Sequence, residues 1–354
     1  MKFGTYYFLQ ATPGRSADAI IADEVEQMVL SERLGFDSVW LTEHHYADYG
    51  ISSAPSLLLA TVAARTDRIR LGMAVWVLPF HHPLRLAEET ATLDILSRGR
   101  LVVGLGRGNR PQEFLGHGVP QDESRSRMQE GLEILRRAWT EERVTFEGRH
   151  WQFDEIPVYP KPFSKPHPPL AFAVSSPESL QWAGINGLPI MSSGLTTPRD
   201  ALLRQRETYV AALRSAGHSE ASISDLLGRW IVSKHVYVAP TDAEARAEAE
   251  GPERWYLDAF ARSIRPVGLR GISEAVREQA HASADRVEAL RWEDLVEDRL
   301  LIGSPETIRR KVAELRDIGV GELLCWMNFG GLPPDKVRRS MQLFADDVIG
   351  QFRA

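Results

Sequence analysis

The sequence predicts an α/β fold, a (β/α)8 TIM barrel built from a single domain that spans residues 1–354. Short apolar runs alternate with amphipathic stretches along most of the chain, which is the rhythm of repeated strand-helix units and of a parallel sheet. Most of these runs are continuously apolar, as expected for strands buried on both faces. No repeat, low-complexity tract or linker divides the 354 residues, a length that such barrels often use as one domain.

The first four predicted strands lie within the first 105 residues. Strands are expected at residues 2–9, 36–41, 69–77 and 100–105, with helices at residues 18–34, 56–65 and 83–96 between them. Gly35 follows the first helix, as a C′ glycine does. Pro55 and Pro83 stand where the next two helices open, because the fixed φ of proline suits the first helical position.

The second half keeps the same alternation with interruptions. Further strands are expected at residues 170–174, 188–191, 229–238 and 322–327, helices at 124–140, 198–215, 242–262, 304–319 and 333–352 and from residue 177, and a small hairpin at 144–153. The pattern weakens between residues 263 and 301. That stretch is too long for an ordinary connection, so we expect an insertion that could act as a lid with a short helix of its own.

Composition limits the classes of function. A formal net charge of -6 without any basic run argues against nucleic acid or an anionic membrane as the main partner. No apolar stretch reaches 18 residues and the chain opens directly into a strand, so neither a membrane span nor a signal peptide is expected and the protein should be cytoplasmic. The single cysteine, Cys325, excludes an internal disulfide framework.

Glu43, His44 and His45 directly follow the second predicted strand. Barrel enzymes place their chemistry just beyond the carboxyl ends of the strands, and histidine can exchange a proton near neutral pH. We therefore take these three residues as the candidate catalytic set. A metal site completed by His81 and His82 is an alternative, but adjacent strand residues point to opposite faces.

Two other strand ends carry features suited to an anion. Gly106 and Arg107 end the fourth strand, where glycine lets backbone approach a ligand and arginine offers a forked cation. The other strand end passes into a helix through a serine-rich turn whose N–H groups and hydroxyls suit a phosphate, and it contains Ser175, Ser176 and Ser179. A simple helix cap is the alternative. Together with Arg125, these groups could converge on one phosphate-sized anion.

Several stretches of the sequence match a known family. They are TEHHYADYG at residues 42–50, LGMAVWVLPFHHPLRLAEE at 71–89, LDILSRGRLVVGLGRG at 93–108, SR at 124–125 and LFADDV at 343–348. In these stretches the sequence resembles the bacterial luciferase-like family of flavin-dependent monooxygenases, and it is most similar to the branch that contains the luciferase alpha chain. Such proteins are (β/α)8 barrels. The resemblance implies a two-component monooxygenase that takes reduced FMN from a separate flavin reductase, forms a flavin 4a-hydroperoxide with O2 and oxygenates a small organic substrate.

The resemblance also implies roles for residues. His44 matches the catalytic histidine, with Glu43 or His45 setting its tautomer. Arg107, Arg125 and Ser176 match positions that grip the FMN phosphate, with Ser179 nearby. Ala74 and Val75 match the site of a non-prolyl cis peptide that supports the isoalloxazine ring.

Two glycines depart from the luciferase alpha chain. Gly106 replaces a reactive cysteine and Gly194 replaces a pocket tryptophan, so we expect both changes to leave space and the substrate pocket to be larger or differently shaped. Four aromatic residues, Trp40, Tyr46, Trp76 and Phe80, are expected to line a dry barrel mouth.

The helices that begin near Ser56 and Leu84, the latter with Glu88 and Glu89, pack two subunits together in this family, so a homodimer is expected. Two other functions stay open at this point, a deazaflavin-dependent oxidoreductase and a flavin-binding protein without catalysis. The substrate, and the choice between hydroxylation and Baeyer–Villiger insertion, are beyond the sequence.

Overall fold

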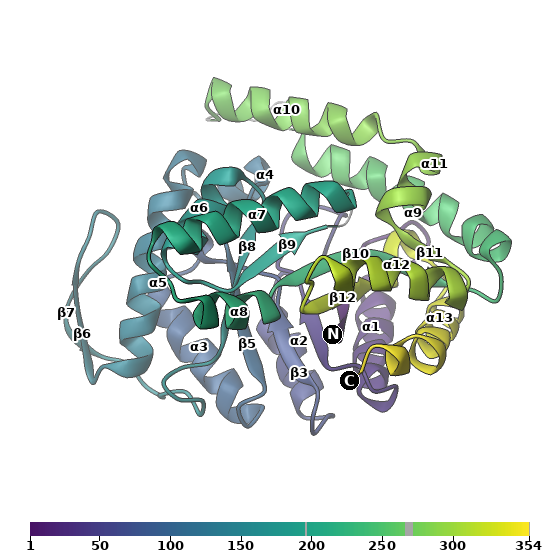
Figure 1. Cartoon of the computed structure of the whole chain (residues 1–354). Coiled ribbons are helices and arrows are strands. Elements are labelled where there is room, and N and C mark those ends of the chain that lie inside the picture. Colours follow the sequence, from purple (N-terminus) through teal and green to yellow (C-terminus); the bar gives the residue numbers. More distant parts are fainter. Residues whose placement is uncertain (195–196, 266–271, 354) are drawn as a thin grey trace.

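The computed structural model describes residues 1–194, 197–265 and 272–353, and in these ranges eight parallel strands close into a barrel (Figure 1). Around the barrel the strands run in the order β1, β2, β3, β5, β8, β9, β10 and β12, and β12 pairs with β1. Their bounds are Lys2–Tyr7, Ser38–Leu41, Arg70–Met73, Leu101–Gly106, Leu170–Val174, Ile190–Ser193, Ile231–Val238 and Glu322–Trp326. The predicted (β/α)8 barrel is confirmed.

The strand predicted at residues 69–77 is interrupted. β3 ends at Met73, and β4 (Trp76–Val77) resumes beside β5 after a cis peptide bond between Ala74 and Val75. The short strands are buried almost throughout, because helices cover the outside of the barrel and side chains fill its inside.

Helices follow most strands and surround the barrel. Their bounds are α1 Ala17–Arg33, α2 Pro55–Ala63, α3 Pro83–Leu96, α4 Pro111–Gly116, α5 Ser124–Thr140, α6 Pro177–Ile185, α7 Arg199–Ser215, α8 Glu220–Gly228, α9 Asp242–Ile264, α10 Glu274–Glu288, α11 Trp292–Asp294, α12 Pro305–Asp317 and α13 Pro334–Asp347. The sequence did not predict α4 or α8. The first of these omissions matters, because α4 carries part of the site.

The predicted insertion at residues 263–301 contains more structure than expected. Its helix, α10, has 15 residues and packs along α9 on the outside of the barrel (Figure 1). At its end, β11 (Leu301–Gly303) adds to β10. Residues 266–271 of the insertion lie outside the described residues. The hairpin β6 (Arg143–Glu147) and β7 (Gln152–Pro157) projects from the body (Figure 1).

None of the helices in the described ranges is long and apolar enough to cross a membrane.

Candidate active site

A cavity of about 220 Å³ opens where β2, β5 and β8 end. All the predicted site residues except His45 line it. The wall consists of Thr42, Glu43, His44, Ala74, Val75, Val77, Gly106, Arg107, Gly108, Asn109, Glu113, Arg125, Met128, Gln129, Phe172, Ala173, Val174, Ser175, Ser176, Ser179, Trp182 and Ser193. The structure thus brings together segments that are far apart in the sequence, at the end of the barrel where such folds bind ligands.

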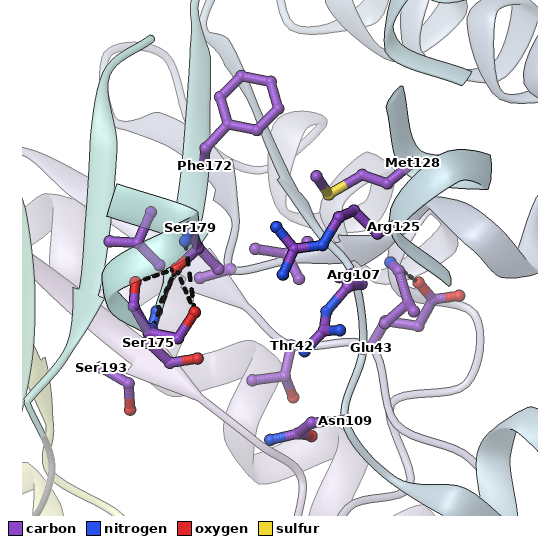
Figure 2. Close-up of a pocket in the computed structure, with 18 of the residues that line it drawn as sticks. Thr42, Glu43, Arg107, Asn109, Arg125, Met128, Phe172, Ser175, Ser179 and Ser193 are labelled. Atoms are coloured by element: carbon purple, nitrogen blue, oxygen red, sulfur yellow. Dashed lines mark hydrogen bonds between the residues drawn. The ribbon is translucent and has the colours of Figure 1, made fainter. Parts of the chain in front are cut away.

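One end of the cavity is cationic. The side chains of Arg107, at the end of β5, and Arg125, in the first turn of α5, extend toward the serine turn that precedes α6 (Figure 2). Neither guanidinium makes a hydrogen bond or an ion pair with another described residue. The pKa of Arg107 is lowered, first by partial burial and then by repulsion from Arg125. The carboxylate of Glu178, in the first turn of α6, acts on both charges, but it forms no ion pair with either among the described residues. Two neighbouring cations without an ion-paired carboxylate form a site suited to an anion.

The serine turn is a complete helix cap. The Ser176 hydroxyl accepts a hydrogen bond from the Ser179 N–H at 3.3 Å, and the Ser179 hydroxyl accepts from the N–H groups of Ser175 and Ser176 at 3.1 and 3.0 Å. The capping role considered from the sequence is therefore present. It does not exclude an anion, because the turn also places the positive end of the α6 dipole in the cavity wall.

The Ala74–Val75 peptide forms the wall between the two ends of the cavity. It is cis, as the resemblance implied. The Tyr6 hydroxyl donates to the Ala74 carbonyl at 2.9 Å, and the Ala74 N–H donates to the Leu41 carbonyl at 2.7 Å. Both bonds come from neighbouring barrel strands, so this peptide is held on both sides.

The prediction that Gly106 and Gly194 leave extra room is wrong. A Cβ at Gly106 would lie 2.4 Å from the side chain of Val75, and a Cβ at Gly194 would lie 2.8 Å from Val232. Both distances are well inside van der Waals contact. Neighbouring side chains therefore occupy the space that the glycines were expected to leave.

The histidine end of the cavity is built around His44. Its ring stacks on Phe8, with 5.4 Å between centroids, and meets the Tyr49 ring edge-on at 5.1 Å. Nδ1 lies 3.0 Å from a carboxylate oxygen of Glu113, in α4. The partner of His44 is thus Glu113, where Glu43 or His45 had been expected. Burial and the charge of Arg110 lower the pKa of His44 and outweigh the opposite effect of Glu113.

Glu43 serves a second, separate network. Its carboxylate accepts hydrogen bonds from the Val77 N–H at 2.6 Å, from His81 Nε2 at 2.8 Å and from His45 Nε2 at 3.2 Å. Burial alone would raise the pKa of Glu43, but these donors outweigh it and hold the pKa at about 2. His45 thus points away from the cavity, toward Glu43, and this pair braces the cavity wall.

The side chains proposed for a metal site do not converge as one set, because only Glu43, His45 and His81 meet. His44 turns to Glu113, and the ring of His82 packs edge-on against Trp151, with 4.8 Å between centroids. Among the described residues, no group of three or more His, Cys, Asp or Glu side chains is placed to hold a metal ion.

The predicted aromatic mouth is also wrong. Trp40 and Trp76 are buried in the core, Tyr46 is half exposed, and Phe80 stacks on the ring of His117 at 4.4 Å. None of the four predicted aromatic residues lines the cavity, and neither does any described residue of the insertion.

The two charged residues beside His44, Arg110 and Glu113, were missed from the sequence. Pro111 follows the end of β5 closely and stands at the first position of α4. Proline at that position is a helix start signal, so the short helix was detectable. The contact between Glu113 and His44 was not detectable, because it joins residues 69 positions apart in the chain.

Comparison with known proteins shows the family. The family model for luciferase-like monooxygenases matches residues 1–322. The chain belongs to that family. It is therefore a monooxygenase, an enzyme of the oxidoreductase class, as the resemblance implied.

Two relatives illustrate the range of enzymes to which the chain is similar. The chain is 30% identical to an alkanal monooxygenase alpha chain of Photorhabdus luminescens over 64% of this chain and 62% of that protein. It is 25% identical to the oxygenase component of a flavin-dependent trigonelline monooxygenase of Acinetobacter baylyi over 99% of this chain and 96% of the relative.

Three solved structures are similar over essentially the whole chain. A monooxygenase from Streptomyces bottropensis is 29% identical with a TM-score of 0.83, covering 100% of both chains. The oxygenating constituent of 3,6-diketocamphane monooxygenase from Pseudomonas putida, a type II Baeyer–Villiger enzyme in complex with FMN, is 26% identical with a TM-score of 0.81, covering 100% and 99%. An F420-dependent secondary alcohol dehydrogenase, 18% identical with a TM-score of 0.76 and coverage of 100% and 99%, shows the fold alone.

Proposed function

We propose that the chain is the oxygenase component of a two-component monooxygenase that uses reduced FMN and O2 to oxygenate a small organic substrate. One observation carries this proposal. Two guanidinium groups that form no hydrogen bond or ion pair with a described residue, Arg107 and Arg125, lie with a capped helix N-terminus in the wall of a cavity that His44 also lines. That arrangement suits a cofactor with an anionic tail and a reactive ring.

The residues present fit FMN. Arg107, Arg125 and the N–H groups of the serine turn would hold its phosphate. Gly106 and the Ala74–Val75 peptide give an apolar wall between the two ends. When bound, reduced FMN supplies the two electrons with which O2 is cleaved, so that one oxygen atom enters the substrate and the other leaves as water.

His44 is suited to accept or hold a proton beside the reacting ring. The lowered pKa of His44 keeps its imidazole neutral at pH 7. The Glu113 carboxylate, whose own pKa is lowered despite burial by its bond to His44, accepts from Nδ1–H. This bond fixes the tautomer in which Nε2 is the free proton acceptor. Glu43 and His45 brace the wall behind it.

The test is an anaerobic titration with reduced FMN followed by mixing with O2 in a stopped-flow instrument. We expect binding and an absorbing species, distinct from reduced and oxidised FMN, that decays about tenfold faster or more in His44→Ala. His82→Ala, outside the cavity, is the control and should behave as wild type. Tight binding of reduced F420 with no binding of FMN would indicate a deazaflavin-dependent oxidoreductase. FMN binding with immediate reoxidation, the same in His44→Ala, would indicate a binder without catalysis.

Two partners belong to the proposal. The name "oxygenase component" of the trigonelline relative supports a separate flavin reductase that supplies reduced FMN. A homodimer through α2 and α3 is supported by apolar side chains that are exposed on these helices, Leu57 at 71% on α2 and Leu96 at 58% at the end of α3. Light scattering should give twice the chain mass for wild type and a shift toward the monomer for Leu57→Glu. A monomeric wild type would remove the dimer from the proposal.

A further inference from the structure

We propose that Arg110 is a positioning residue for the reaction, because it holds Glu113 against His44 and ties this pair to helix α9. The inference rests on the role of His44 proposed above. It adds a third member to the pair and gives the buried cation a function.

Arg110 is a buried cation at the start of α4. Only 4% of the residue is exposed. The guanidinium lies over the Tyr49 ring, 4.0 Å from its centroid, and 5.3 Å from that of Phe260 in α9. It also donates a hydrogen bond to the Ser263 hydroxyl, near the end of α9. Two rings and a hydroxyl thus hold the charge in place.

Glu113 is the nearest carboxylate to this cation, with 3.9 Å between Arg110 Nε and Glu113 Oε1. The same oxygen lies 3.0 Å from His44 Nδ1 and accepts from the His45 N–H at 3.1 Å. A buried carboxylate is costly unless charge and hydrogen bonds compensate it. The positive charge of Arg110 compensates the charge of the Glu113 carboxylate. The hydrogen bonds to His44 and His45 fix the orientation of that carboxylate.

The local fold makes this anchoring necessary. α4 has only six residues, too few for a stable helix on its own. Its position depends on tertiary contacts, and those of Arg110 attach the N-cap of α4 to the loop at Tyr49 and to α9. They act together with the bond from the Gln112 side chain to the Tyr46 carbonyl, which anchors α4 to the loop after His44.

Arg110 also balances the charge around His44. The titratable and charged groups that face this histidine are Glu113 from α4, Arg110 from the N-cap of α4, Glu43 from its own strand end and Tyr49 from the following loop. The two carboxylates favour the imidazolium, whereas Arg110 and burial disfavour it. Loss of the cation should therefore let His44 take up a proton at higher pH.

The decisive experiment is an NMR titration of His44 in histidine-labelled protein without flavin, with the signal assigned from His44→Gln. We expect the midpoint to move up in Arg110→Met, which removes the cation, and down in Glu113→Gln, which removes the anion. Arg127→Met, two residues beyond Arg125 on α5 and paired with Glu123, should leave the midpoint unchanged. An unmoved or lowered midpoint in Arg110→Met would overturn the proposal.

Milder variants keep the test decisive if Arg110→Met does not fold. Arg110→Lys and Ser263→Ala both retain the positive charge, so both should keep the wild-type midpoint. A shift in either as large as that of Glu113→Gln would contradict the balance of charges. Because these titrations need no flavin, they stay interpretable even if FMN does not bind.

A kinetic measurement separates positioning from general damage. In Arg110→Lys the reduced-FMN affinity should stay within about twofold of wild type, since the residue does not line the cavity. The decay of the absorbing species after mixing with O2 should change with pH around the same midpoint as the His44 titration of that variant. If the affinity for reduced FMN falls and the decay rate of the absorbing species changes by the same factor at every pH, Arg110 has a purely structural role and the proposal is overturned.

Discussion

The two ends of the cavity are built on opposite principles. At the cationic end, the side chains of Arg107 and Arg125 are exposed and form no hydrogen bond or ion pair with a described residue. At the histidine end, Glu43 and Glu113 are buried, and each accepts hydrogen bonds from the side chain and backbone around it. One end is left incomplete without a ligand, whereas the other is complete in the folded chain.

This difference predicts two kinds of mutational effect. A group without a protein partner contributes to ligand affinity and little to folding, because its removal breaks no contact in the free protein. A buried carboxylate with three donors contributes to folding, because its loss leaves those donors without an acceptor. Substitutions at the two ends should therefore separate affinity from stability.

The largest effect on stability is expected for Glu43→Gln. The amide carries no charge for His45 and His81, and its NH2 group cannot accept the Val77 N–H. We expect the free energy of unfolding to fall by about 3 kcal/mol, measured by urea denaturation. Glu88→Gln on α3, which removes a more exposed carboxylate paired with Arg85, should cost less than about 0.5 kcal/mol. A loss at Glu43 as small as that would show that the network does not support the wall.

Low pH should remove the contribution of the ionised Glu43 carboxylate to the free energy of unfolding. The pKa of Glu43 is about 2 in the folded protein against an ordinary value of 4.5 for a glutamate, so its ionised form is favoured by folding. The stabilisation is complete above pH 4.5 and is lost as the pH falls toward 2, by about 3 kcal/mol in all. The stability difference between wild type and Glu43→Gln should therefore shrink between pH 5 and pH 3. A constant difference across that range would contradict the low pKa.

The opposite signature is expected for Arg107→Met and Arg125→Met. Each should weaken binding of reduced FMN by about 10- to 100-fold, since a charge-assisted hydrogen bond to phosphate is lost. The free energy of unfolding should change by less than about 0.5 kcal/mol. Reduced riboflavin, which lacks the phosphate, is the internal control and should bind wild type and both variants alike. An equal loss for riboflavin and FMN would place the phosphate elsewhere.

The sequence predicts regular elements well where local signals agree. β8, α3 and α5 have the predicted bounds, because proline, a run of apolar residues or a helical period marks each boundary. The predicted cavity residues converge for a general reason, since parallel strands end at one face of the barrel. His45 was the exception, because its partner is Glu43.

Contacts between elements that are distant in the sequence could not be predicted. The partner of His44 lies on a six-residue helix that the pattern did not show, and the space beside Gly106 is filled by Val75, from the segment between β3 and β4. Both depend on tertiary packing, which overrides local pattern. The same holds for Trp40, where an aromatic near a strand end proved to be core.

The smallest effect, and the finest test of the comparison, concerns the serine turn. Ser176 and Ser219 are both N-cap residues whose hydroxyls accept an N–H three residues ahead, at 3.3 and 3.2 Å. Only Ser176 lies at the cavity. Substitution of either by alanine should cost about 1 kcal/mol of unfolding free energy, because each removes one cap.

FMN affinity should distinguish the two caps. We expect Ser176→Ala to weaken binding of reduced FMN by a few-fold, less than either arginine variant, because the backbone N–H groups and the α6 dipole remain in place. Ser219→Ala should leave the affinity unchanged, as measured in the same anaerobic titration. If the two variants bind FMN equally well, the Ser176 hydroxyl caps a helix and nothing more, and the cationic end of the cavity consists of the two arginines and the backbone.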